Sequence, residues 1–396
     1  MSAAASRDAL AAVDDLLSPL TAIRRDLHAN PELGYAEHRT AARVADELRA
    51  LGLEVTAGVG GTGVVGVLRN GASDRRIGLR ADMDALPIVE NTGLAHASCR
   101  HGVFHGCGHD GHTTMLLGAA WHLSRTRRFD GTIVFVFQPA EEGLAGAKAM
   151  IEAGLFARFP MDEIYALHNW PELPAGEART RPGAIMAAAD RFDLLVEGRG
   201  GHAAQPHTTP DAVLAASQLV TQLNTIVSRR IAPSASAVLS VTRIEGGSSH
   251  NVLPASVALT GTVRSFDAAV QNRIEESLRA VAAGVALATE TRIDVAYTRY
   301  YPATINDPEC AAHALAAAKI ACERAEMAEH PSFASEDFAF LLQAKRGAYL
   351  WLGQGRGLGF GNGDAPLHHP SYDFNDAIIG RGVAWYSALA EARLSA

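Results

Sequence analysis

An eight-residue run, His105–His112, limits the folds open to this chain more than any other segment. It carries one cysteine, three histidines and an aspartate, and its three glycines let the backbone bend tightly around whatever those side chains hold. Thiolate, imidazole and carboxylate donors together suit Zn²⁺, and Ni²⁺, Co²⁺ or Mn²⁺ could also use them. The alternative is a polar turn in which histidines gather by chance, but similar donors recur later in the chain. We therefore expect a fold that brings distant donors to this run.

Length and composition are those of a two-domain globular protein. At 396 residues the chain is too long for one hydrophobic core, and 48% hydrophobic and 20% charged residues are ordinary values. The net charge of −8 argues against nucleic acid or a membrane as partner, and no apolar run is long enough to span a bilayer. The first residues do not resemble a signal peptide, and four cysteines do not make a disulfide framework. We therefore expect a cytoplasmic protein, whose reducing surroundings would keep Cys107 available as a thiolate.

Helix and strand signals alternate in the first half of the chain, which predicts an α/β sheet covered by helices. We expect helices over 6–27, 38–51, 111–125 and 146–153, a β-hairpin of 63–68 and 77–79 around Asn70-Gly71, and strands over 132–137 and 163–167. The segment Gly61–Gly66 also matches the dinucleotide-binding fingerprint. A β-branched run and a turn follow it where that motif needs a helix, so we do not expect nucleotide binding there.

Polar donors follow three of the predicted strands. Asp82 and Asp84 come after 77–79, Glu141 and Glu142 come after 132–137, and His168 comes after 163–167. Because ligand sites in open α/β sheets lie beyond the carboxyl ends of strands, we expect these side chains to lie near His105–His112.

The middle of the chain has a different pattern, β-α-β-β-α-β, which is typical of a ferredoxin-like domain. We expect strands over 191–196, 237–243, 257–266 and 292–297, and helices over 211–227 and 267–289. The predicted organisation is a first domain made of 1–186 and 300–396, with a second domain inserted at 187–299.

Eight short motifs occur in an order that resembles a known enzyme family. They are Arg80–Pro87, His105–His112, Gln138–Gly143, Ala166–Asn169, Gly200–Ala204, His250–Pro254, Ser335–Phe338 and Leu367–Pro370. Together they resemble the dinuclear-metal amidohydrolases that include hippurate hydrolases, N-acyl-amino-acid deacylases and auxin-conjugate hydrolases. These are relatives of the aminoacylases and of metallo-carboxypeptidases with a lid domain. The motifs span nearly the whole chain and specify the family much better than the substrate.

The resemblance implies two divalent metal ions per subunit and names their ligands. The implied ligands are Cys107, His109, Glu142, His168 and His368. Glu141 would be the general base, because two ions lower the pKa of a water molecule toward about 7 and a nearby carboxylate can take its proton. The alternative for the glutamate pair is a solvated loop. The family motif favours His368 over its neighbour His369.

Other residues of these motifs have supporting or alternative roles. Asp82 stands where distant relatives carry a histidine ligand, which argues against a ligand role for this aspartate. Asp84 is counted with Glu141 among the catalytic residues, as the carboxylate that would orient a metal-bound histidine. Asp110 and His112 either support the metal site or form hydrogen bonds at a helix N-terminus.

The inserted domain would act as a lid and dimerisation domain. In the relatives, a histidine at the position of His202 reaches the partner subunit's active site and stabilises the tetrahedral oxyanion, which is worth about 3–4 kcal/mol. Asn251 and Arg264 would hold the substrate carboxylate, although Arg264 could instead form a salt bridge at a strand end. The resemblance therefore implies a homodimer or a higher homo-oligomer.

These features predict a hydrolase that cleaves N-acyl amino acids into a carboxylate and a free amino acid. A dipeptidase or carboxypeptidase on the same scaffold is the first alternative. A metal-binding protein without catalysis is a second, and a cysteine hydrolase that uses Cys107 is a third.

Overall fold

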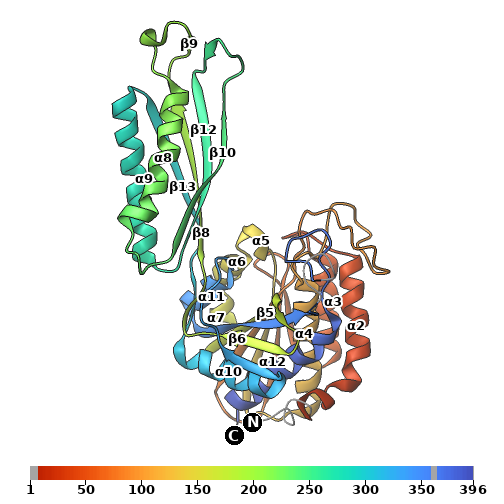
Figure 1. Ribbon diagram of the computed structural model, residues 1–396. Coiled ribbons are helices and arrows are strands. Elements are labelled where there is room, and N and C mark those ends of the chain that lie inside the picture. The colour runs from red at the N-terminus through yellow and green to blue at the C-terminus, as the bar shows by residue number, and fades with distance from the viewer. Residues whose placement is uncertain (1–7, 358–363, 396) are drawn as a thin grey trace. The chain divides into compact units, whose positions relative to one another are not determined.

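The computed structural model describes residues 8–357 and 364–395, and the chain forms two compact units (Figure 1). The first contains Met1–Ile185, Thr304–His330 and Asp337–Ala396, and the second contains Met186–Ala303 and Pro331–Glu336. The chain thus changes unit after residues 185, 303, 330 and 336, whereas the prediction had changes only after residues 186 and 299. Across the described ranges, no helix has both the length and the apolar character needed to cross a membrane.

The first unit is built on a mixed eight-stranded sheet in the order β1-β2-β4-β3-β5-β16-β6-β15. The strands are β1 (Glu54–Val59), β2 (Gly63–Asn70), β3 (Arg76–Asp82), β4 (Gly131–Gln138), β5 (Glu163–Pro174), β6 (Glu177–Thr180), β15 (Arg324–Met327) and β16 (Arg346–Gly355). Neighbours β4, β3, β5 and β16 are parallel, whereas β1, β2 and β4 pair antiparallel. The parallel strands are buried almost throughout, as expected for strands covered on both faces.

The predicted hairpin of 63–68 and 77–79 is wrong. Strand β2 pairs with β1 and β4, and β3 pairs with β4 and β5, so β4 lies between the two strands that the Asn70-Gly71 turn connects. The local turn signal is real, but pairing of the long buried strand β4 with both neighbours overrides it.

Helices cover the sheet of the first unit. They are α2 (Asp14–Ala29), α3 (His38–Ala50), α4 (His109–Thr126), α5 (Glu141–Leu144), α6 (Gly146–Glu152), α7 (Leu155–Arg158), α10 (Pro308–Ala321), α11 (Phe338–Ala344) and α12 (Ile379–Arg393), with a 3₁₀ turn η2 (Asp376–Ile378). A two-stranded sheet joins β14 (Thr304–Asn306) to β7 (Gly183–Met186). The predicted helix over 6–27 begins outside the described residues.

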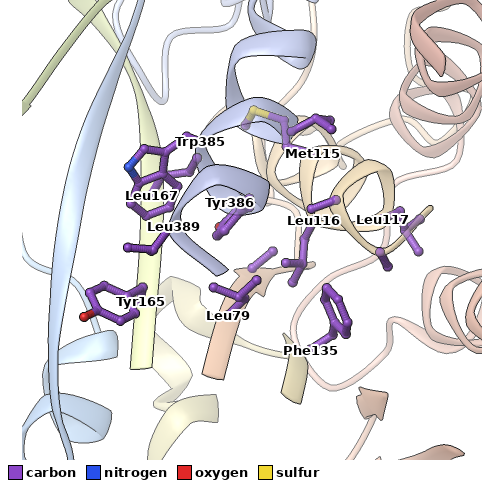
Figure 2. Packing of buried hydrophobic residues seen from close by; sticks show 14 of the residues in the cluster. Leu79, Met115, Leu116, Leu117, Phe135, Tyr165, Leu167, Trp385, Tyr386 and Leu389 are labelled. Atoms are coloured by element: carbon purple, nitrogen blue, oxygen red, sulfur yellow. The ribbon is translucent and has the colours of Figure 1, made fainter. Parts of the chain in front are cut away.

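Helix α4 lies in the middle of this core, between the sheet and helices α2 and α12. Figure 2 shows its Met115 near α12, and Leu116 on the same helix facing Leu79 and Phe135 of the sheet. Each such side chain contributes about 1.5–3 kcal/mol on burial. A Cβ at Gly382 would lie 2.0 Å from the Met115 sulfur, so only glycine lets α12 approach this closely. The packing fixes the N-terminus of α4, which begins at His109 rather than at the predicted residue 111.

The second unit has the element order β8-α8-β10-β12-α9-β13, as predicted. These are β8 (Ala188–Glu197), α8 (Ala212–Arg230), β10 (Ala237–Gly246), β12 (Ser256–Ser265), α9 (Ala268–Thr289) and β13 (Arg292–Tyr301). The antiparallel sheet has the order β10-β12-β8-β13, and Figure 1 shows both helices on one of its faces. Alternate residues of β8 such as Phe192 and Leu194 are buried, and carboxylates Asp211 and Asp267 cap the two helices.

Three short elements complete the second unit. Strand β9 (Gly201–His202) pairs with β11 (Val252–Leu253), and η1 (Pro206–Thr208) follows β9. The predicted fold class is confirmed: a mixed α/β sheet covered by helices, with an inserted βαββαβ domain.

Candidate metal centre and active site

Donor side chains meet at the carboxyl edge of three adjacent parallel strands, β4, β3 and β5. Asp84 follows β3, and Glu141 and Glu142 follow β4. The prediction that the next strand ends at residue 167 is wrong, because β5 remains paired with β16 beyond His168. His168 therefore projects from inside a strand, where its backbone is fixed by pairing.

The loop before α4 and the first residue of that helix bring two further donors, Cys107 and His109, to this edge. Between them Gly108 has φ 89°, and a Cβ there would lie 2.5 Å from the Asn169 side-chain oxygen and 2.6 Å from the Tyr372 hydroxyl. Glycine is therefore required both for the left-handed backbone and for the close approach. The glycines of the sequence motif thus serve the placement of the donors.

Two of the donor groups overlap at Cys107. One contains Cys107, His109 and His168, and the other contains Cys107, Glu142 and His368, with ligand atoms in each set within 4.8 Å of one another. Cys107 Sγ lies 3.4 Å from His168 Nε2, and His368 Nε2 lies 3.3 Å from Glu142 Oε1. All five predicted ligands are therefore neighbours.

The orientation of the buried histidines fits metal binding. His109 Nδ1 lies 3.2 Å from Asp84 Oδ1, and His168 Nδ1 donates to the carbonyl oxygen of Asn169 at 2.7 Å. Nε2 of His109 has no hydrogen-bond partner among the described residues, although it is buried. In a typical metal-binding histidine, one ring nitrogen donates a hydrogen bond to an acceptor and the other ring nitrogen faces the metal site. His109 and His168 have this arrangement. The residues present therefore fit a pair of divalent cations.

The pKa shifts of Cys107 and His168 also fit metal binding. Burial, together with the charges of Glu142 and Glu141, raises the pKa of the Cys107 thiol well above its usual range. A free nucleophilic thiolate is therefore disfavoured, which argues against the cysteine-hydrolase alternative, whereas a bound cation would stabilise the thiolate. Burial, with the nearby His112, lowers the pKa of His168 and keeps it in the neutral form that metals bind.

Asp84 connects the two sides of the site. Its Oδ1 lies against His109, and its Oδ2 accepts the backbone N–H of Glu142 at 2.9 Å. One buried carboxylate therefore orients a histidine donor and positions a carboxylate donor.

Asp82 lies close to His109 and His112, with ligand atoms within 4.8 Å of one another, but both of its oxygens already have partners. Its Oδ1 lies 2.6 Å from His112 Nδ1, and its Oδ2 accepts from Arg80 at 2.7 Å. The other ring nitrogen of His112 lies 2.6 Å from the side-chain oxygen of Asn169. His112 thus links β3 to β5, and its ring packs against those of His109 and His168, with centroids 5.4 Å and 4.5 Å apart.

Asp110 points away from the donors into a separate buried network. Its Oδ2 lies 2.8 Å from His28 Nδ1 and 3.5 Å from Arg24, and its Oδ1 accepts the N–H of Gly111. Asp110 therefore anchors the first turn of α4 to α2.

An irregular turn presents Glu141 and Glu142. Ala140 has φ 54°, a left-handed conformation that costs an alanine roughly 1 kcal/mol or more. Its N–H donates to Glu37 Oε1 at 2.8 Å, while Asp84 holds the N–H of Glu142. Sequence reasoning missed Glu37, since no local pattern connects it to a loop about a hundred residues later.

His368 and His369 are distinguished by their partners. His368 has φ 65°, its backbone N–H donates to the Gly106 carbonyl at 2.8 Å, and its ring lies against Glu142. His369 Nδ1 instead accepts the N–H of Ser371 at 3.1 Å. The loop geometry therefore directs His368 to the donor cluster.

The other three predicted site residues belong to the second unit. His202 on β9 and Asn251 directly before β11 are exposed neighbours, and the N–H of Ala203 donates to the Asn251 carbonyl at 3.1 Å. Arg264 lies on β12, and its guanidinium donates to the Val263 carbonyl at 3.0 Å. Burial lowers the pKa of Arg264.

The fold and site define a metal-dependent hydrolase of the α/β type. The model of the peptidase family M20/M25/M40 matches residues 78–392, and the chain belongs to this family. It is 41% identical over 378 residues to a hippurate hydrolase of Campylobacter jejuni, covering 95% of this chain and 97% of that protein.

A further relative and a solved structure agree with this assignment. An N-acetyl-L-cysteine deacetylase of Bacillus subtilis is 39% identical over 361 residues, covering 91% of this chain and 84% of that protein. The crystal structure of a dinuclear metal-binding peptidase of the M20 family from Bacillus subtilis superposes with a TM-score of 0.82 at 32% identity, covering 96% of this chain and 99% of that one. The chain is therefore an amidohydrolase of this family.

Proposed function

We propose that the protein hydrolyses the amide bond of N-acyl amino acids and releases a carboxylate and a free amino acid. The position of Glu141 carries this proposal. A carboxylate oxygen of Glu141, a ring nitrogen of His109 and a carboxylate oxygen of Glu142 lie within 4.8 Å of one another, and Glu141 Oε1 accepts the backbone N–H of Asp337 at 3.2 Å. A carboxylate held beside the donors suits a general base better than a further ligand. The names of the two curated relatives support the substrate class.

In the proposed mechanism, Glu141 accepts a proton from the attacking water and returns it to the leaving nitrogen. Asp84 keeps His109 and Glu142 in place throughout. His202 donates a hydrogen bond to the oxyanion that develops on the carbonyl oxygen. When bound, the two cations supply Lewis-acid polarisation and make a water molecule acidic.

We propose that Cys107, His109, Glu142, His168 and His368 hold those cations. A mixture of one thiolate, imidazoles and a carboxylate suits Zn²⁺, Mn²⁺, Ni²⁺ or Co²⁺, and it does not suit the all-oxygen preference of Ca²⁺ or Mg²⁺. Because a reduced Cys107 is required, and because all four cysteines are free thiols, we also propose a cytoplasmic location.

We propose that two protomers complete each active site. His202 follows the end of β8 at Glu197, which pairs with Ser256, whereas Arg264 pairs with Ala189 at the beginning of β8. At about 3.3 Å per residue, roughly 25 Å of β12 separates Arg264 from the end of the strand that adjoins Asn251. One protomer therefore cannot bring Asn251 and Arg264 to the same substrate carboxylate. Two protomers can, if one supplies Arg264 and the other supplies Asn251 with His202.

A substrate panel tests the proposed activity. The purified protein is stripped with a chelator and assayed for release of free amino acid from N-benzoylglycine, N-acetyl amino acids and an unblocked dipeptide. We expect no turnover without metal, and recovery with Mn²⁺, Zn²⁺, Co²⁺ or Ni²⁺ on the acylated substrates. Cleavage of the dipeptide alone would assign a dipeptidase, and turnover that survives the chelator would rule out the metal mechanism.

A further inference from the structure

A fully buried arginine lies directly beneath the site. Arg80 is on β3 with a side chain exposed by 0%, and its guanidinium lies between the carboxylates of Asp82 and Asp337, at 2.7 Å and 3.1 Å. Its Nε also donates to Gln138 Oε1 at 2.8 Å. A planar guanidinium has separate donors for each of these partners, which a lysine ammonium at the end of a flexible stem cannot reproduce.

One branch of this network leads to Glu141. The Gln138 amide donates to both oxygens of Asp337 at 2.7 Å and 2.9 Å, and the N–H of Ala147 donates to the same carboxylate at 2.9 Å. With its side chain held in this way, Asp337 offers its own backbone N–H to Glu141 Oε1. The carboxylate of Glu141 is therefore oriented by a peptide group whose position depends on Arg80.

The other branch leads to the histidines of α4. Asp82, fixed by Arg80 through Oδ2, places Oδ1 against His112, and its carbonyl oxygen accepts the hydroxyl of Thr113 at 2.8 Å. His109 Nε2 lies 3.9 Å from Asp82 Oδ2. The first turn of α4, which begins at His109, is thus tied to the same guanidinium.

We propose that Arg80 is a positioning residue that holds Glu141 and the His109 turn in a fixed relation to each other, and so aligns the base with the metal centre. The inference rests on the proposed role of Glu141 as base. A displacement of about 1 Å in such a constellation is enough to lower turnover by about 10²-fold. Arg80 itself is shielded from substrate by the network above it.

The decisive variant is Arg80→Lys, which keeps the buried positive charge but cannot bridge Asp82 and Asp337. Arg393→Lys is the matched control, because Arg393 forms a comparable two-pronged pair with Glu163 (3.0 Å and 2.9 Å) at the amino end of β5, away from the site. We expect Arg80→Lys to lower kcat by about 10²-fold with KM nearly unchanged. We also expect it to weaken metal binding about 10-fold, measured by competition with a chelator. Arg393→Lys should lower only the melting temperature.

A double variant separates positioning from general stability. In the Glu141→Gln background, Arg80→Lys should change the residual kcat less than about threefold, because residues that act through one group are not additive. A further 10²-fold loss there, or a kcat and metal affinity equal to those of Arg393→Lys, would overturn the inference.

Two further variants keep the inference testable if Arg80→Lys cannot be measured or if Glu141 is not the base. If Arg80→Lys does not fold, Gln138→Met tests the inference instead, because it removes the amide between Arg80 and Asp337 but leaves every charge. A roughly 10-fold lower kcat in this variant supports the inference, and an unchanged kcat refutes it. If Glu141→Gln alone keeps its turnover, the proposed base is wrong and the inference falls with it. A dead Glu141→Gln beside a fully active Arg80→Lys refutes the inference alone.

Discussion

The sheet edge of the first unit and the β9–β11 pair of the second present their functional side chains in opposite ways. In the first unit, His109, His168 and Asp84 are buried and each has a partner supplied by another element or by the next residue, and of the proposed ligands there His368 is the most exposed, at 52%. In the second, His202 and Asn251 are exposed, and their side chains accept hydrogen bonds from Ala204 and Ser249, each two positions away.

This contrast follows from what each set is proposed to do. Donors for a cation must be desolvated and oriented in advance, because buried polar groups are tolerated only when they are paired or bound to a metal. Groups that meet the substrate must stay accessible until it arrives. Substitutions in the first unit should therefore change metal content or stability along with turnover, while those on the β9–β11 pair should change turnover alone.

The largest effect is expected for Glu141→Gln. This substitution lies in the first unit but should lower turnover without lowering metal content. The amide is nearly isosteric but cannot accept the proton of the water, so kcat should fall by about 10²- to 10⁴-fold. Bound metal, measured by mass spectrometry, should stay near wild type because Glu141 is not a proposed ligand. Substantial remaining turnover would remove Glu141 as the base.

His202→Ala should lower kcat by about 10²- to 10³-fold without loss of metal, because one donor to the oxyanion is removed. If the histidine acts across a dimer, mixing His202→Ala with Glu141→Gln under subunit exchange should restore activity. One site of the mixed dimer then carries both defects and the other carries neither, so the rate per dimer should approach half that of wild type.

The absence of rescue despite proven subunit exchange would contradict the two-protomer site. A fully active monomer would contradict it as well, and analytical ultracentrifugation of the active enzyme checks this.

Cys107→Ala should reduce metal binding and activity together, because the thiolate belongs to both donor sets. We expect metal affinity to fall by at least about 10- to 100-fold, with activity following the occupancy of the site. His202→Ala is the control that should retain its metal. Trapping of a covalent acyl group on Cys107 during turnover would show instead that the thiol is a nucleophile.

The smallest effect on turnover is expected for the buried network around Asp110, which acts on the stability of the fold. Burial by itself would lower the pKa of His28, but its hydrogen bond to Asp110 raises it to about 9. Since the unfolded value is about 6.5, this interaction stabilises the fold fully below pH 6.5, and the stabilisation is lost as the pH rises through 9. The loss amounts to about 3 kcal/mol in the free energy of unfolding.

Urea unfolding at pH 6 and pH 9.5 measures this difference. His28→Gln should be less stable at pH 6 and should lose most of the pH dependence, whereas the exposed His330→Gln should behave like wild type. An unchanged pH dependence in His28→Gln would place its origin elsewhere.

Much of the site was predictable because its chemistry is concentrated in short segments. A run with Cys107 and His109 separated by glycine is unusual enough to indicate metal binding, and the rule that ligands gather at the carboxyl ends of parallel strands brings Glu142 to it. The same rule led to His168, although that residue lies inside β5. The βαββαβ order of the second unit was predictable for a similar reason. Its strands alternate buried and exposed residues, as β8 does, and its two helices each have an aspartate N-cap.

The sequence by itself thus determined which metal-donor side chains are available and which segments form strands and helices, because side-chain chemistry and hydrophobic periodicity are local properties. Only the tertiary structure decided that β4 separates β2 from β3, that Arg80 bridges Asp82 and Asp337, and that Asn251 and Arg264 lie far apart. Each of these depends on which distant segments pack together. That choice is made by the free energy of the whole core and leaves no pattern in any one segment.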